Sequence, residues 1–320
     1  MIVVIGEALI DLIQDPTQAE KFTAVTGGAN ANVALSLARR EHPHQFLGRI
    51  SDDLFGKQIR KHLADNNVSL DLAINAEQQS TLAFAALDEQ GVASYSFYVE
   101  NTADWMWQKN ELPDLETLAE LEVSTVQFGC LTMAMGPGNK VIEAWLAEIF
   151  ASDAMTLSHD LNIRPALGVD KTSELDRIEK LNRISTIIKA SDADIEWLYG
   201  EKDFDDVARD WMGGLSKLVV ITRGSEGAVL YRGDDKIEIP GVVIDLQDTV
   251  GAGDTFMANL LVELDLLSGL GSEPLKRIER LDIEDIEKCA RVAVMASAIA
   301  CEREGAQPPT EKELQLRLEQ

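Results

Sequence analysis

The chain begins with the apolar run Met1-Ile-Val-Val-Ile-Gly6, which ends at a glycine. A short run that is apolar at every position is typical of a strand buried on both faces, as in a parallel sheet. Similar runs follow at residues 125–129, 154–157, 186–188 and 218–221. Amphipathic stretches that indicate helices alternate with them, at residues 32–40, 55–66, 138–150 and 283–303. This alternation predicts an α/β fold, a doubly wound and mostly parallel sheet with helices on both faces.

Two segments interrupt the alternation, because they carry strand-like residues with no helix between them. One covers residues 8–13. The other predicts a hairpin in which residues 81–87 and 94–99 flank a turn at 88–91. We therefore expect a small antiparallel β-sheet that projects from the body as a lid. The expected body comprises residues 1–7, 14–80 and 106–320, and the expected lid comprises residues 8–13 and 81–105.

The charge of the chain excludes some classes of partner. Its 320 residues are 45% hydrophobic, which is ordinary for a globular protein. However, 29 Lys and Arg against 55 Asp and Glu give a formal net charge of −26. So acidic a protein repels nucleic acids and anionic membranes, and we expect neither as a partner. The longest apolar stretch, residues 292–301, is too short to span a bilayer.

The cysteines predict the compartment. Cys130, Cys289 and Cys301 are an odd number and show no CxxC spacing. Together with a start that lacks a signal-peptide pattern, they predict a cytoplasmic protein in a reducing environment.

The late segment Asp248-Thr-Val-Gly-Ala-Gly-Asp-Thr-Phe256 carries the sharpest chemical signal. Its small residues Gly251, Ala252 and Gly253 precede an amphipathic stretch, residues 255–267, that indicates a helix. Small residues at a helix start let several backbone N–H groups point at one spot, which forms an anion hole for a phosphate. Asp254 beside this hole can accept the proton of an attacking alcohol. The alternative is a glycine-rich turn in which Asp254 only caps the helix.

The early segment Thr26-Gly-Gly-Ala-Asn-Ala-Asn-Val-Ala34 also places paired glycines before a helix. Gly28 would let the backbone approach a ligand, and Asn32 could bond to neighbouring hydroxyl groups. By itself, this segment favours an ordinary turn and helix cap over a ligand site.

In this order and separation, the two segments resemble those of the ribokinase-like (PfkB-type) carbohydrate kinase family. The resemblance covers nearly the whole chain and includes residues 6–11, 160–164, 222–227 and 301–310. The last of these, with Phe97-Tyr98 and Thr102-Ala-Asp104, is most similar to the bacterial fructokinase branch. The family implies ATP-dependent transfer of the γ-phosphoryl group to a primary hydroxyl of a small sugar, with fructose as the first candidate.

The resemblance also implies a role for each matching residue. Asp254 matches the catalytic base, and the anion hole matches Gly251, Ala252 and Gly253. The residues implied to bind the sugar are Asp11, Gly28, Asn32, Phe97 and Arg164. Those implied to bind the nucleotide are Asn162, Ser191, Thr222, Gly224 and Gly227. Asp194 is implied to organise Mg²⁺ through water, and the positions implied to hold a monovalent cation are Asp248, Ala300 and Gly305.

Three positions depart from the family pattern. Asp194 stands where members often have a glutamate, so the carboxylate is kept on a shorter side chain. Val99 stands where this branch often has an arginine, which removes a cation that could bind an acidic sugar or a sugar phosphate. Asn30 stands where the fructokinase branch usually has a proline.

Several alternatives stay open at this point. The substrate could be a 2-keto-3-deoxy sugar acid, a ketohexose phosphate or a nucleoside. A catalytically inactive sugar sensor on the same fold is an alternative of another class, although an intact Asp254 and anion hole argue against it. A dinucleotide oxidoreductase is excluded, because the turn after the first strand lacks GxGxxG. We expect ATP, Mg²⁺ and K⁺ as cofactors, and a homodimer formed through the lid, because a lone hairpin is marginally stable.

Overall fold

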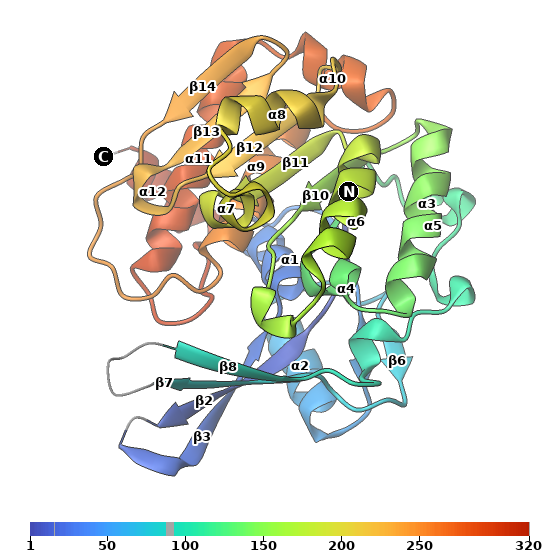
Figure 1. The fold of residues 1–320 in the computed structure, drawn as a ribbon, viewed down its shortest axis with the longest axis vertical. Helices are drawn as coiled ribbons and strands as arrows, with labels where there is room; N and C mark the ends of the chain where they lie inside the picture. The colour runs from blue at the N-terminus through green and yellow to red at the C-terminus, as the bar shows by residue number, and fades with distance from the viewer. Residues whose placement is uncertain (16, 88–92, 320) are drawn as a thin grey trace.

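The computed structural model describes residues 1–15, 17–87 and 93–319, and its centre is a sheet of eight strands (Figure 1). The strand order is β14-β13-β12-β11-β10-β9-β1-β4. Neighbours from β12 to β4 pair in parallel, and β13 and β14 add an antiparallel hairpin at one edge. The strands are β1 (Ile2–Ile5), β4 (His44–Leu47), β9 (Thr125–Gly129), β10 (Thr156–Asp160), β11 (Ile187–Ser191), β12 (Leu218–Thr222), β13 (Ala228–Arg232) and β14 (Asp235–Ile239).

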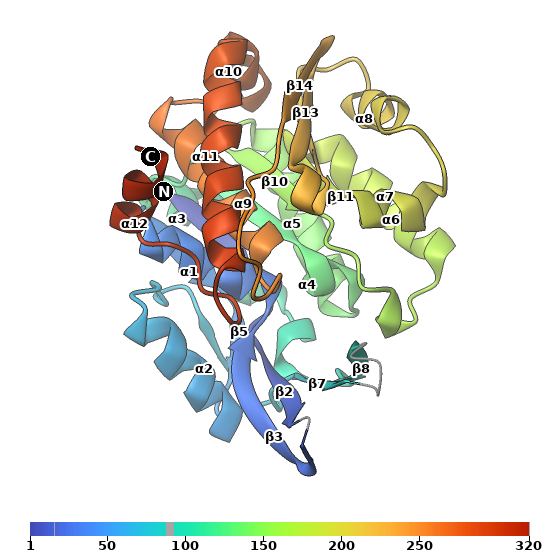
Figure 2. The same ribbon diagram turned by 90° about the vertical axis from the view of Figure 1, so that its left-hand side faces the viewer.

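Helices cover both faces of this sheet, which is why every residue of β1 is buried (Figure 2). Ile2 and Val4 belong to one hydrophobic cluster with residues of α1 (Ala29–Arg39), α9 (Ala252–Leu266) and α11 (Ile283–Cys301). Val3 and Ile5 belong to a cluster on the other face with α5 (Gly138–Ser152). Farther along that face, β11 and β12 pack against α6 (Lys171–Ile184) and α8 (Phe204–Met212). The predicted doubly wound α/β fold is confirmed.

Shorter elements complete the body. The remaining helices are α2 (Leu54–Asp65), α3 (Leu115–Glu120), α4 (Cys130–Ala134), α7 (Asp192–Tyr199), α10 (Pro274–Arg280) and α12 (Glu311–Leu318). β5 (Arg49–Ser51) and β6 (Ile74–Ala76) form a separate parallel pair. The sequence analysis does not predict the edge strand β14. Exposed residues interrupt its buried ones, so it shows no continuous apolar run.

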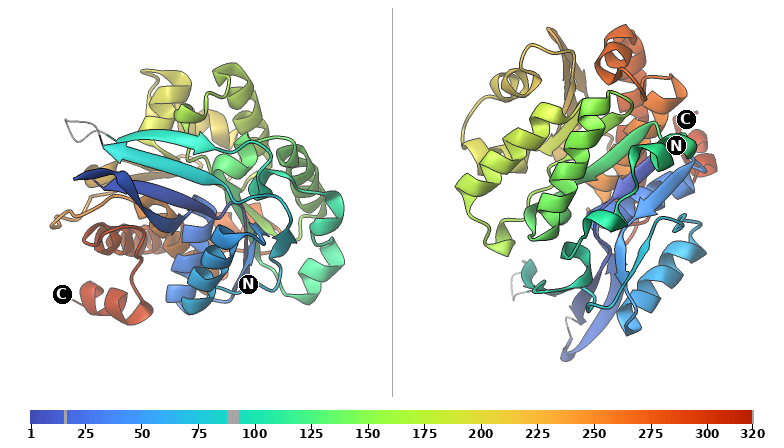
Figure 3. Two further views of the ribbon diagram at one scale, coloured as in Figure 1. Left: turned by 90° about the horizontal axis from the view of Figure 1, so that it is seen from below. Right: turned by 90° about the vertical axis from the view of Figure 1, so that its right-hand side faces the viewer.

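A second sheet of four strands lies beside the body, in the order β3-β2-β7-β8 (Figure 3). The predicted hairpin is confirmed as β7 (Leu82–Leu87) and β8 (Ala93–Tyr98), whereas its turn at 88–91 lies outside the described residues. β2 (Leu9–Asp15) pairs in parallel with β7, so the sheet is mixed and not purely antiparallel.

The expected boundaries of the lid need a correction. They assign residues 14–80 to the body, but β2 continues to Asp15, and β3 (Gln18–Gly27) pairs with β2 in the lid sheet. The sequence pattern does not reveal β3, because its first six residues are exposed and show no apolar alternation.

The three cysteines, Cys130, Cys289 and Cys301, are free thiols. Burial raises the pKa of each thiol, so none is poised to act as a thiolate nucleophile. In the ranges that the structure describes, no helix combines the length and the apolar character needed to cross a membrane.

Candidate active site

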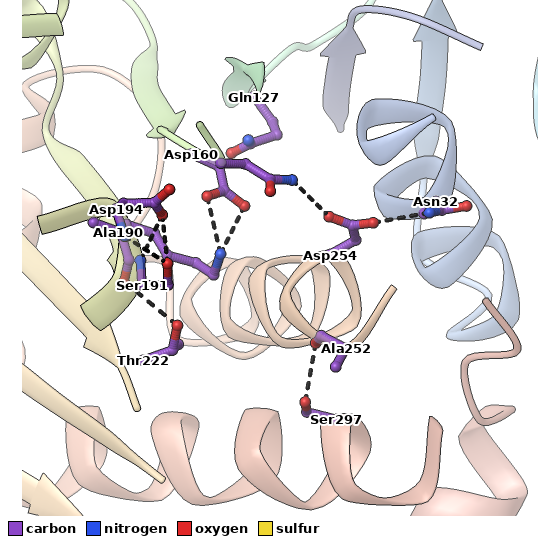
Figure 4. A network of polar contacts seen from close by, with 12 residues as sticks. Asn32, Gln127, Asp160, Ala190, Ser191, Asp194, Thr222, Ala252, Asp254 and Ser297 are labelled. Carbon is purple, nitrogen blue, oxygen red and sulfur yellow. Dashed lines mark hydrogen bonds and ion pairs between the residues drawn. The ribbon is translucent and has the colours of Figure 1, made fainter. Parts of the chain in front are cut away.

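The predicted site residues gather at the carboxyl ends of the parallel strands. Ligands of such sheets bind at these ends, at the point where the strand order reverses. Here the chain goes from β1 outward to β4 on one side and from β9 to β12 on the other, so this point lies between β1 and β9. Figure 4 shows the polar contacts nearby, which join α1, α9 and the ends of β10, β11 and β12.

Glu7, just after β1, holds the start of α1 in place. Its Oε1 accepts from the Ala29 backbone N–H at 3.1 Å, and its Oε2 accepts from Asn30 Nδ2 at 3.0 Å and Thr132 Oγ1 at 2.5 Å. Gly28 has a φ of +109°, and a Cβ there would lie 2.6 Å from the Glu7 carbonyl oxygen, so the close approach requires glycine. Asn30 therefore has a structural role at the helix start.

The predicted anion hole falls on the start of α9. Gly251 has a φ of +73°, and the helix begins at Ala252. The first N–H groups of a helix have no carbonyl partner within it, so those of Gly253 and Asp254 are available to an anion. The Ala252 carbonyl accepts the hydroxyl of Ser297 on α11 at 3.0 Å, which anchors this turn (Figure 4).

Asp254 lies in the first turn of α9 and is 6% exposed. Its Oδ2 accepts from Asn32 Nδ2 at 2.8 Å, and its Oδ1 accepts from Asn162 Nδ2 at 3.3 Å. These contacts give Asp254 partners outside its own helix, unlike a simple cap. Burial raises its pKa to about 6, although the hydrogen bond from Asn32 opposes the shift. A carboxylate with this pKa is ionised at neutral pH and well matched to accept a proton.

A buried ion pair lies next to the start of α9. The sequence analysis does not predict it. Lys189 Nζ donates to both carboxylate oxygens of Asp160, at 2.9 and 2.8 Å. A Cβ on Gly253 would lie 3.3 Å from this ammonium nitrogen. Burial by itself would lower the pKa of Lys189, but the charge and hydrogen bonds of Asp160, together with the charges of Asp254 and Asp194, raise it. A fixed positive charge therefore lies beside the start of α9. Its only sequence signal is a lysine inside an apolar strand.

The residues predicted to bind the sugar come from both the lid and the body. Asp11 lies on β2, and a Cβ on Gly27 would lie 2.1 Å from its Oδ2. Burial raises the pKa of Asp11 to about 6, and the charge of Arg164 opposes this shift. The structure thus brings Asp11 and Arg164 within electrostatic reach. Phe97, on β8, packs into a cluster with Trp105 at the junction of lid and body.

The residues predicted to bind the nucleotide lie mainly at the ends of β11 and β12. Ser191 and Thr222 are partners in the register of these strands. The following turn contains Gly224 and Gly227, with φ values of +51° and +91°. A Cβ on Gly227 would meet the Ile239 carbonyl oxygen at 2.1 Å, so glycine is required there. Asn162 lies apart from this group, because its amide contacts the base.

Asp194 closes a capping box at the start of α7. Its Oδ2 accepts from the backbone N–H and the hydroxyl of Ser191, at 2.7 and 2.8 Å. Among the described residues, its Oδ1 accepts only from the Ile163 backbone N–H, at 2.8 Å. Asp194 can therefore contact a metal-bound water through Oδ1, which fits the predicted indirect role. Over residues 1–15, 17–87 and 93–319, no three His, Cys, Asp or Glu side chains converge to hold a metal ion.

Two of the residues predicted to hold a monovalent cation, Asp248 and Gly305, are in direct contact, and the Asp248 backbone N–H donates to the carbonyl of Cys301, next to Ala300. Asp248 Oδ2 accepts from the Gly305 backbone N–H at 2.8 Å, and Oδ1 accepts from Val250 N–H at 3.0 Å. The carbonyl oxygen of Ala300 accepts from the Arg303 backbone N–H at 3.1 Å. Each Asp248 oxygen keeps a second lone pair, as an oxygen ligand of K⁺ needs.

An open helix start next to a buried carboxylate, at the carboxyl ends of a parallel sheet, is an arrangement suited to phosphoryl transfer. Residues 1–313 match the pfkB family of carbohydrate kinases. The chain belongs to this family, as its early and late segments imply.

Relatives and solved structures support this assignment. A fructokinase of Rhizobium leguminosarum bv. trifolii is 39% identical over 266 residues, which cover 82% of this chain and 79% of the relative. Fructokinase-1 of Oryza sativa subsp. japonica is 29% identical over 325 residues, covering 98% and 96% of the two chains. The crystal structure of fructokinase with bound ATP from Xylella fastidiosa has a TM-score of 0.89 and 26% identity, covering 99% of this chain and 98% of that one.

The raised pKa of Asp254 predicts a stability that depends on pH. The native state favours the protonated carboxyl, so stability is lost as pH rises from about 4 through about 6. We expect Asp254→Asn to gain stability relative to the parent over this range and to keep the gain at pH 8. Thermal unfolding from pH 4 to pH 8 measures the difference. Asp205→Asn is the matched control: hydrogen bonds from Lys236 and Tyr231 lower the pKa of Asp205, so this substitution should lose stability by an amount that stays nearly constant above about pH 4. A difference for Asp254→Asn that does not change with pH would contradict the prediction.

Proposed function

We propose that this protein transfers the γ-phosphoryl group of ATP to a primary hydroxyl of fructose. The observation that carries the proposal is the position of Asp254, held by Asn32 and Asn162 at the edge of the open helix start. The 39% identical relative from Rhizobium, named fructokinase, supports fructose as the acceptor. Val99 packs in an apolar cluster with Trp105, so it offers no cation to an acidic sugar or sugar phosphate.

In the proposed reaction, the γ-phosphate lies against the first N–H groups of α9. Asp254 accepts the proton of the sugar hydroxyl as that oxygen bonds to the γ-phosphorus. The bond from this phosphorus to the oxygen bridging to the β-phosphate breaks, and ADP leaves. Negative charge spreads over the transferred group, and Lys189 lies where its charge stabilises that state. The lid closes over the sugar and excludes water from the transferred group.

The proposal includes two cations. Mg²⁺ would be held mainly by phosphate oxygens and waters, and Asp194 would orient it through a water at Oδ1. Mg²⁺ offsets the charge of the phosphates when bound. K⁺ would bind near Asp248, Ala300 and Gly305, next to the anion hole: a Cβ on Gly251 would lie 2.8 Å from Ala306. The three free thiols support a location in the reducing cytoplasm.

The function is tested first with a panel of sugars in a coupled assay of ADP release. We expect the parent to phosphorylate fructose in preference to nucleosides, ketohexose phosphates and deoxy-sugar acids. Asp254→Asn keeps the shape of the side chain but cannot take the proton, so kcat should fall at least about a hundredfold. Both KM values should stay nearly unchanged, because the lost interaction belongs to the transition state. Near-native turnover by this variant would show that Asp254 is not the base, and a parent that phosphorylates no sugar of the panel would favour the sugar sensor over the kinase.

Asp11 should contribute to sugar affinity and not to ATP affinity. A buried hydrogen bond to a charged group is worth about 1.5–3 kcal/mol, so Asp11→Ala should raise the sugar KM roughly ten- to a hundredfold. The KM for ATP should stay within a few-fold. Asp15→Ala, on the same strand but at its far end, is the control that should change neither constant. A loss of ATP affinity with intact sugar affinity would show that the sugar site is placed wrongly.

We also propose that two copies of the chain pair through their lids. Phe22, Phe84 and Tyr98 share the lid face opposite to Asp11, because residues on one strand alternate between faces. The ring centroids of Phe22 and Phe84 are 5.5 Å apart, and those of Phe84 and Tyr98 are 5.0 Å apart. Tyr98 is 62% exposed and Phe22 is 42% exposed, so this aromatic row is available to a second copy.

Sedimentation at micromolar concentration tests the dimer. The parent should sediment as a dimer, and the double variant Phe22→Glu/Tyr98→Glu as a monomer, because two charges would enter the apolar contact. Leu54→Glu is the control, since Leu54 is 77% exposed on α2, outside the lid. A monomeric parent would contradict the pairing and would leave the kinase proposal intact.

A further inference from the structure

The chain passes between body and lid at four places, and one buried aspartate joins three of them. Ala8 precedes β2, Thr81 precedes β7, and Thr102 follows β8. Asp104 lies just beyond, in a short turn that ends at Trp105. Its Oδ1 accepts from the Ala8 backbone N–H at 3.0 Å, and its Oδ2 lies 2.6 Å from Thr81 Oγ1.

These contacts continue as a single chain of hydrogen bonds. Thr81 Oγ1 lies 2.6 Å from Thr102 Oγ1, which in turn lies 3.2 Å from the Val99 carbonyl oxygen. Each of the three contacts joins two oxygen atoms, so each needs one proton between them. The hydroxyl groups of Thr81 and Thr102 supply two protons. Among the groups that make these contacts, the third proton can come only from the carboxyl group of Asp104.

The surroundings favour this source. Thr81 is 0% exposed, Thr102 6% and Asp104 1%, so bulk water does not reach the chain of contacts. Burial raises the pKa of Asp104 to about 7, against the hydrogen bonds from Thr81 and Ala8. The carboxylate of Glu7, at the end of β1, raises it too.

We call the contacts among Ala8, Thr81, Thr102 and Asp104 the hinge. One cation also lies close to this hinge. Arg49 of β5 donates to the Ala103 carbonyl at 3.1 Å, next to Asp104 in the chain. Its Nε lies 3.2 Å from Glu111 Oε2, so Glu111 balances its charge. The charged groups that the structure describes around Asp104 are therefore the ion pair of Arg49 with Glu111 and the carboxylate of Glu7.

We propose that Asp104 is a positioning residue of the lid: its carboxyl group carries a proton in the native enzyme, and loss of that proton loosens the lid and weakens sugar binding. Without the proton, one contact of the chain becomes two oxygens facing each other with no hydrogen between them. Asp11 follows Ala8 on the same strand, so its position over the sugar depends on this hinge. Asp254 belongs to the body, so its position does not depend on this hinge.

The first experiment measures the KM for fructose from pH 7 to pH 9, and its readout rests on the proposed function. Asp11 and Asp254, with pKa values of about 6, are ionised throughout this range. We expect the parent KM to rise about two- to tenfold, the effect of losing one buried hydrogen bond. kcat and the KM for ATP should stay nearly constant over the same pH range. Asp104→Asn should give a flat profile, because its amide donates to Thr81 at every pH.

A matched pair at Thr102 tests the proton count by another route. Thr102→Ser keeps the hydroxyl and should keep the rise of KM at high pH. Thr102→Val removes two contacts, so the Thr81 hydroxyl alone satisfies an ionised Asp104, and the rise should disappear. Equal profiles for the two variants, or a rise that persists in Asp104→Asn, would overturn the proposal.

Thermal unfolding gives a readout that does not depend on the substrate. The native state holds the proton of Asp104 up to about pH 7, whereas the unfolded state loses it near pH 4. The contribution of this proton to the stability of the protein therefore falls as pH rises from about 4 through 7. The melting temperature of Asp104→Asn should therefore rise relative to the parent between pH 5 and pH 8. A constant difference would refute the proton on Asp104, even if fructose proved not to be the substrate.

Discussion

The hydrogen bond from Asn32 to Asp254 joins two helix starts that are 222 residues apart in the chain. It forms because β1 occupies the interior of the sheet, so that α1 begins at the strand ends where α9 also begins. Both helices cover the same face and share one hydrophobic cluster. The glycine of the early segment, the anion hole of the late segment and the base thus meet at one point only if the whole sheet is in place.

The site contains several buried carboxylates in a chain whose net charge is already −26. Buried charges are tolerated when each has its own partners. Glu7 accepts from a helix start, Asp160 is paired with Lys189, and Asp254 is bonded to two asparagine amides. These different partners give the carboxylates different tasks, because a salt bridge fixes charge near the phosphate whereas an amide leaves the base free to take a proton.

The residue proposed to bind the sugar and the proposed base belong to different parts of the molecule. Asp11 is carried by the lid, and Asp254 by the body. In the proposed closed state, the distance between Asp11 and Asp254 therefore depends on the junction of lid and body, where Ala8 is bonded to Asp104. A lid of this kind can exclude water only if its crossings hold their geometry, which explains why polar contacts concentrate at the junction and apolar residues cover the outer lid face.

The sequence by itself predicted the α/β class, β1, β9, β12 and the helices α1, α2, α5, α9 and α11, and it singled out the segment of the proposed anion hole and base. These features depend on local patterns: a continuous apolar run, a helical period, and glycines at a helix start. Only the tertiary structure decided the rest. β3 carries no apolar pattern, Asp194 proved to close a capping box, and Asn162 lies against the base. The pairing of Lys189 with Asp160 and the proton count at Asp104 join residues far apart in sequence. Burial and neighbouring charges set their behaviour, and both arise only when distant segments pack together.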